Sequence, residues 1–199
     1  IGRLSTGLGV SSTDLLEVSR ILAQTGLRAS EVRRALDALA KSTLAPTFND
    51  IKNTAEGAVA AMAQFGIGAR DLEKVLGSIN AVAGKFAVEA EDLISVIRRT
   101  GGVFKAAAGD LDAPIDQLNQ LIAVFTSVRA TSRESADSIA VGLRTIFSRI
   151  QRPRTIAFLK QFGVELDDLN DKFVGPYEAI RRLSEAFRTL DTRDVRFAK

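Results

Sequence analysis

Apolar residues recur along most of this chain at intervals of three and four, which is the spacing of one face of an α-helix. No run alternates between apolar and polar residues convincingly enough to predict a β-strand. Two of the clearest apolar stripes are Leu36, Leu39 and Ala40, and Leu118, Leu121, Ile122 and Phe125.

The pattern predicts nine helices and one segment of a different kind. Residues 164–175 are expected to form a small hairpin or an irregular loop. No heptad is sustained, so a long coiled coil is not expected. The predicted helices span residues 12–25, 30–44, 48–65, 69–84, 90–107, 113–128, 133–151, 154–162 and 176–190.

One short pattern accompanies the predicted helix boundaries at five places. It consists of a glycine, an aliphatic residue, three variable positions, an acid, and then Leu or Val. The five copies are GVSSTDL at residue 9, GLRASEV at 26, GIGARDL at 66, AVEAEDL at 87 with Ala87 in place of glycine, and GVELDDL at 163.

Each part of the pattern suits a joint between two helices. Glycine ends a helix in the left-handed conformation, and the aliphatic residue packs back on that helix. A small polar residue, such as Ser12 or Ser30, is expected to cap the next helix, with the acid in its first turn. Thr131 and Glu134 similarly predict a capping box for the helix at 133–151.

Repeated joints predict an all-α fold, built as an irregular array of helical hairpins joined by short glycine turns. The spacing of the joints holds no fixed period, so a regular solenoid repeat is not expected. We divide the chain into an N-terminal helical hairpin at 1–45 and an Ala/Gly-rich helical core region at 47–199. One continuous helical domain is the other arrangement considered.

Composition narrows the chemistry. The 199 residues are 46% hydrophobic and 26% charged, with 27 basic and 24 acidic residues and neither histidine nor cysteine. The usual zinc sites and the Ser–His and Cys–His nucleophile systems are therefore excluded. A Ser–Lys or paired-carboxylate enzyme stays formally open, but we expect no enzyme activity, no metal and no cofactor.

Two further functions are considered for particular segments. Residues 21–36 resemble a DNA-reading helix-turn-helix in which Arg28, Arg33 and Arg34 lie near the start of the second helix. Residues 57–69 are apolar except for Gln64, and a membrane-active helical protein would use them. The chain starts with Ile rather than Met, so we expect an internal piece of a longer protein.

The strongest charge feature is a basic run without an intervening acid, which we select as the candidate partner contact. A solvated helix end is the structural interpretation, and an acidic partner, a nucleic-acid backbone or a membrane headgroup is the functional one. Phe147, Phe158 and Phe162 are expected to be core residues. The run comprises Arg144, Arg149, Arg152, Arg154 and Lys160.

Residues 135–169 resemble the core region of phage tail tape measure proteins. The likeness rests on a run formed by Gly142, Leu143, Arg144, Phe147 and Arg149, on the joint Phe162-Gly163-Val164, and on an acidic loop followed by a helix led by Pro176. Ala/Gly-rich helices upstream extend it over roughly residues 10–190.

This resemblance implies a structural role without an active site. A tape measure protein fills the tail tube or tail tip, sets tail length during assembly in the host cytoplasm, and leaves ahead of the DNA. Its implied partners are further copies of itself, as a trimer or hexamer, the tail tube, and the distal tail and tail-tip or baseplate hub proteins. During ejection the host membrane or DNA would join them.

Overall fold

The computed structural model describes residues 1–189, which contain ten helices and no strand of a sheet. The all-α prediction is therefore confirmed. The helices are α1 (Gly2–Leu8), α2 (Ser12–Gln24), α3 (Ala29–Ser42), α4 (Ile51–Phe65), α5 (Leu72–Lys85), α6 (Ala90–Ala108), α7 (Pro114–Ser132), α8 (Ala136–Ile150), α9 (Pro153–Lys160) and α10 (Pro176–Thr189).

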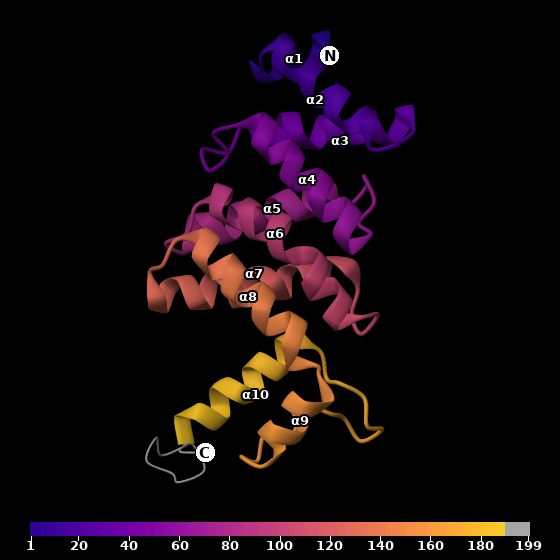
Figure 1. The fold of residues 1–199 in the computed structure, drawn as a ribbon. Coiled ribbons are helices and arrows are strands. Elements are labelled where there is room, and N and C mark those ends of the chain that lie inside the picture. Colours follow the sequence, from indigo (N-terminus) through magenta and orange to yellow (C-terminus); the bar gives the residue numbers. More distant parts are fainter. Residues whose placement is uncertain (190–199) are drawn as a thin grey trace.

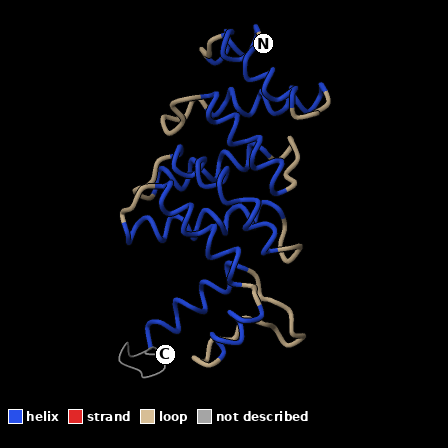
Figure 2. Tube along the Cα trace, in the orientation of Figure 1, coloured by secondary structure: helices blue, strands red, loops and turns tan. Residues whose placement is uncertain are grey.

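The helices form an elongated stack that runs from α1 at one end to α9 and α10 at the other (Figure 1). Loops lie along both sides of the stack, because successive helices turn back at each joint (Figure 2). Helix α6 lies in the middle and packs against α4, α5, α7, α8 and α10. The short helix α1 is not among the sequence predictions, and Leu190, the last residue of the predicted C-terminal helix, lies outside the described residues.

A single large core runs through most of the stack, from Val10 at the first joint to Phe147 in α8. It includes residues on both sides of Pro46, and both predicted apolar stripes are buried in it. A second, much smaller core lies beyond α8 and consists of Ile150, Val164, Leu166 and Ala179. The last layer of the stack is therefore the least completely buried.

Four of the five predicted joints contain a left-handed glycine. The φ angles are 69° at Gly9, 80° at Gly26, 72° at Gly66 and 77° at Gly163. The fifth joint differs, because α5 ends at Lys85 and the next residue, Phe86, is extended. The left-handed conformation would cost an L-residue such as Ala87 about 1–2 kcal/mol, so the chain turns at this joint without a left-handed residue.

The predicted helix caps are wrong by one or two residues. Ser11, not Ser12, caps α2 and accepts a hydrogen bond from the Asp14 backbone N–H at 3.4 Å. The N-cap of α3 is Arg28 rather than Ser30.

The predicted capping box at Thr131 and Glu134 is also wrong. Helix α7 continues to Ser132 and ends where Arg133 adopts the left-handed conformation at φ 55°, and α8 starts only at Ala136. The Ser135 hydroxyl caps α8 by accepting from the Ser138 backbone N–H at 3.2 Å.

Glycines allow α4 and α6 to cross at close range. A Cβ atom on Gly57 of α4 would lie 2.6 Å from Cγ2 of Ile94, and one on Gly101 of α6 would lie 2.7 Å from Cε2 of Phe65. Between these points, Gln64 Nε2 donates a hydrogen bond to the backbone oxygen of Arg98 in α6 at 3.0 Å. Much of the apolar segment 57–69 is thus packed inside the protein, and no described helix has the length and apolarity needed to cross a bilayer.

The last joint leads into a loop, as predicted for residues 164–175. An isolated antiparallel bridge pairs Asp167 with Phe173. The Asp168 carboxylate accepts the backbone N–H groups of Lys172 at 2.9 Å and Asn170 at 2.8 Å, and these bonds lower its pKa. The acid of the repeated pattern therefore holds a tight turn here, and Leu169 is fully exposed.

Candidate interaction surfaces

The predicted basic residues are all exposed, as a contact with a partner requires. Arg144 and Arg149 project from α8, Arg152 precedes α9, and Arg154 is in its first turn. Within residues 1–189 none of these four guanidinium groups forms an ion pair or a side-chain hydrogen bond. Lys160 differs, because its Nζ lies 3.5 Å from Glu165 Oε1.

The five basic residues do not form a single stripe. Arg144 and Arg149 are five positions apart, which separates them by about 140° around α8 at 3.6 residues per turn. Three of the residues nevertheless lie within six positions where α8 gives way to α9. We call this group, Arg149, Arg152 and Arg154, the α8–α9 corner.

The three phenylalanines expected in the core differ in how far they are buried. Phe147 is fully buried, and its ring meets that of Phe104 edge-on at 5.0 Å, as predicted. Phe162 is half-buried. The prediction for Phe158 is wrong, because its side chain is 55% exposed and rests against Phe162 at a ring distance of 5.1 Å.

The sequence carries a signal for the exposure of Phe158. Ile156, Ala157, Phe158 and Leu159 are four consecutive apolar residues, which spread over about 300° of a helix. A helix that packs on one side cannot bury all four. In the structure Ile156 and Leu159 face the small core, and Ala157 and Phe158 face outward.

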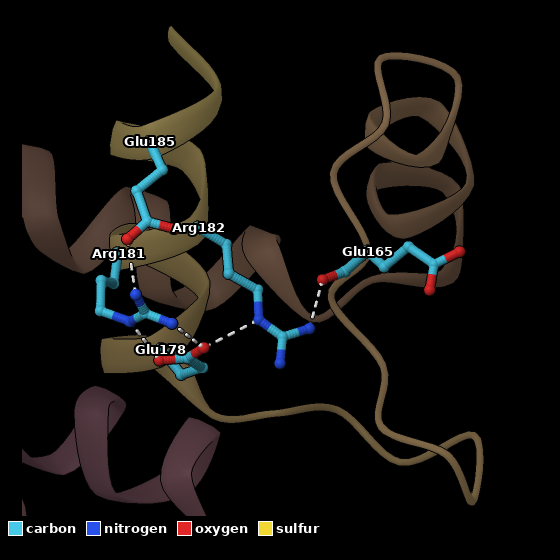
Figure 3. A network of polar contacts seen from close by, with 5 residues as sticks. All are labelled: Glu165, Glu178, Arg181, Arg182 and Glu185. Atoms are coloured by element: carbon cyan, nitrogen blue, oxygen red, sulfur yellow. Dashed lines mark hydrogen bonds and ion pairs between the residues drawn. The ribbon is translucent and has the colours of Figure 1, made fainter. Parts of the chain in front are cut away.

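A polar network fastens α10 to the chain that follows α9 (Figure 3). Arg182 donates from Nε to Glu178 Oε1 at 2.9 Å and from Nη1 to the backbone oxygen of Glu165 at 2.7 Å. Arg181 donates to Glu178 at 2.7 Å and to Glu185 at 2.5 Å. The network adds polar contacts between two segments that also meet in the small core, through Val164 and Leu166 on one side and Ala179 on the other.

Glu178 is the central acceptor of this network. Hydrogen bonds from Arg181 and then Arg182 stabilise its carboxylate and lower its pKa to about 2 from an ordinary value of 4.5. The side chain is 28% exposed, so solvent screens these interactions only in part. Glu178 therefore stays ionised across the physiological pH range.

Two grooves flank the outer side of α7. One, of about 580 Å³, lies between α7 and α10 and is lined by Ala123, Ser127, Ile180 and Arg188 among others. The other, of about 520 Å³, lies between α7 and α5 and shares Ala123 and Ser127, with Phe86 on its far side. Small side chains on the exposed face of α7 create both hollows.

The three arginines of the helix-turn-helix interpretation differ in their contacts. Arg28 is bound within its own helix, because its Nη2 lies 2.9 Å from Glu31 Oε1. This contact lowers the pKa of Glu31 to about 2. Arg33 and Arg34 are exposed. Among residues 1–189 no group of three or more acidic side chains is arranged to hold a metal ion.

The architecture is that of an all-α stack of helical hairpins whose exposed features are grooves, a basic corner and an uncovered aromatic ring. Residues 1–198 match the family model described as phage-related minor tail protein, and the chain belongs to that family. No solved structure matches the chain. Membership assigns the protein a structural role in phage tails, and hence a place in the virion among other tail components.

Proposed function

We propose that this chain is a non-catalytic segment of a tail tape measure protein. In this role it occupies the tail tube or tail tip, sets tail length during assembly in the host cytoplasm, and is released during DNA ejection. Family membership over residues 1–198 supports this proposal. The likeness of residues 135–169 to tape measure proteins supports the finer assignment.

The observation that carries the proposal is the one-dimensional order of the fold. Hairpins follow one another along the stack in chain order (Figure 1). In such an arrangement the length of the assembly is a function of the number of residues, since each unit touches mainly its neighbours. A length standard needs this proportionality, and a globule with a central core lacks it.

Tail length in particles tests the proposal. The α2–α3 hairpin, 31 residues from Ser12 to Ser42, is duplicated in tandem within the full-length protein. If the hairpins lie opened along the tube as helix, tails lengthen by about 47 Å at 1.5 Å per residue. If the stack persists, they lengthen by about 10 Å, the thickness of one helical layer.

Electron microscopy of many particles separates these outcomes. The same hairpin supplied as a separate peptide is the control, and it should leave tail length unchanged. Tails of unaltered length with the tandem duplication would refute a role in length control. They would leave the tail family assignment intact.

The proposed partners are further copies of the chain, as a trimer or hexamer, the tail tube, and the distal tail and hub proteins, with host membrane or DNA joining at ejection. Sedimentation and light scattering of the purified chain test self-association. A mass of three or six times 21.4 kDa supports it. A monomer at concentrations up to the millimolar range contradicts self-association by this segment alone.

A further inference from the structure

The chain contains the same joint twice, and within residues 1–189 a helix covers one copy more completely than the other. Gln64-Phe65-Gly66-Ile67 follows α4, and Gln161-Phe162-Gly163-Val164 follows α9, with both glycines left-handed. Aligned on these residues, Gly57, Ala61 and Leu72 correspond to Arg154, Phe158 and Leu169. The two copies can therefore be compared position by position.

The first copy is sealed by α6. Gly57, Ala61 and Phe65 lie at intervals of four on one face of α4 and are all buried. Ile94 of α6 fits against Gly57, and Gly101 of α6 fits against Phe65. Leu72 beyond the joint is buried as well. In the first copy, the apolar stripe that precedes the joint is therefore buried by a helix packed across it.

The second copy has no such cover within the described part of the chain. Helix α9 packs against α8, and its Ile156 and Leu159 face the small core that includes Ala179 of α10. Phe158 is 55% exposed, whereas Ala61, the corresponding residue of the first copy, is buried. Leu169 is fully exposed, whereas the corresponding Leu72 is buried. A larger apolar side chain is exposed at the position that the first copy buries under α6.

Charge defines what kind of helix fits. Arg154 occupies the place of Gly57 and lies on the same face as Phe158, four residues later. In the first copy, the covering helix α6 packs Ile94 against Gly57. A helix that covered the second copy would meet the cation Arg154 at the corresponding point. Between Asp137 and Glu165 the chain has no acid, and the α8–α9 corner adds Arg149 and Arg152. A second α9 would bring like charges together, which disfavours a copy of the same face as the partner.

We propose that the α9 face formed by Arg154, Ala157 and Phe158 docks an acidic amphipathic α-helix supplied by another polypeptide of the tail. The aromatic ring of Phe158 is the apolar anchor, and a carboxylate on the partner helix pairs with Arg154. The proposal requires membership of the tail family. It does not require that the protein sets tail length.

Site-specific photo-crosslinking in assembled tails tests this surface. A photoreactive amino acid replaces Phe158 in the full-length protein, and crosslinked peptides are identified by mass spectrometry. Leu16 in α2, which is 58% exposed at the other end of the stack, is the control position. We expect position 158 to crosslink to one helical, net acidic segment of another tail polypeptide, and position 16 not to reach that segment.

Charge reversal then separates docking from mere proximity. Arg154→Glu should lower the crosslink yield about tenfold, the factor that corresponds to losing one strong interfacial contact. Reversing the facing acid of the partner to Lys should restore the yield. Arg33→Glu, which reverses an exposed arginine on α3, should leave it unchanged. Equal melting temperatures of the variants show that the fold is kept.

Each other result overturns the proposal. Crosslinks from position 158 to nucleic acid or lipid would assign the surface to a different class of partner. Crosslinks within the same chain would show that the face is covered internally. Yields that do not respond to Arg154→Glu, or that match those from position 16, would show that no specific partner docks there. The duplication experiment on tail length is independent of all these outcomes.

Discussion

Two adjacent glycines in α6 provide a direct test of the close crossing with α4. A Cβ atom on Gly101 would lie 2.2 Å from Gln64 Oε1 and 2.7 Å from Phe65 Cε2. On Gly102 it would lie 4.0 Å from the nearest atoms of Gln64, which is ordinary contact. Gly101→Ala and Gly102→Ala therefore differ in steric cost and share the same gain in helix propensity.

The shared gain is about 1 kcal/mol, because alanine loses less backbone entropy than glycine in a helix. Gly102→Ala should stabilise the protein by up to that amount. In Gly101→Ala, the buried Phe65 ring has little room to move. Displacing Gln64 would also break its bond to Arg98 O, worth about 0.5–1.5 kcal/mol.

Overpacking of this kind costs about 1–3 kcal/mol, so the two variants should differ in unfolding free energy by that amount. Urea titration measures the difference, and the melting temperatures should lie about 4–8 °C apart for a difference near 2 kcal/mol. Equal stability of the two variants would refute the close crossing. Gln64→Ala combined with Gly101→Ala should recover part of the loss.

Three further predictions concern burial, charge and backbone conformation. Phe147→Ala should cost about 3–5 kcal/mol of unfolding free energy by opening a cavity, whereas Phe158→Ala should change it little; equal losses in urea titrations would contradict the assigned burial. Because the pKa of Glu178 is lowered to about 2, its contribution to stability is complete above pH 4.5 and is lost as the pH falls toward 2. Melting curves of Glu178→Gln should lack this acid-dependent part, and an unchanged pH profile would count against the network. Gly163→Ala should cost about 1–2 kcal/mol by forcing alanine to φ 77°, while Gly142→Ala within α8 should not destabilise; the reverse order would exclude the left-handed joint.

Local chemistry made much of the fold predictable. A glycine that follows an apolar helical run can adopt a left-handed turn whatever surrounds it, so Gly9, Gly26, Gly66 and Gly163 were found from sequence. Cap positions were less predictable. Ser11 and Ser12 are adjacent and chemically alike, and only the path of the chain into α2 decides which hydroxyl reaches the Asp14 backbone N–H.

The candidate surface was predictable only in part. Its cations are predictable, because a basic run without acids can be recognised in the amino-acid sequence alone. The separation of Arg144 from the α8–α9 corner depends on where α8 ends, and the exposure of Phe158 depends on which helix faces α9. Neither property belongs to the residue itself.

The sequence by itself determined the helices, their approximate bounds and the left-handed glycine joints, because these depend on contacts within a few residues. The tertiary structure alone decided which copies of one joint are buried. Leu72 and Leu169 end two copies of the same seven-residue pattern, yet one is buried and the other is exposed. The physical reason is that burial requires a neighbouring surface, and α6, which covers the first of the two copies that share the Gln-Phe-Gly core, lies more than twenty residues further along the chain.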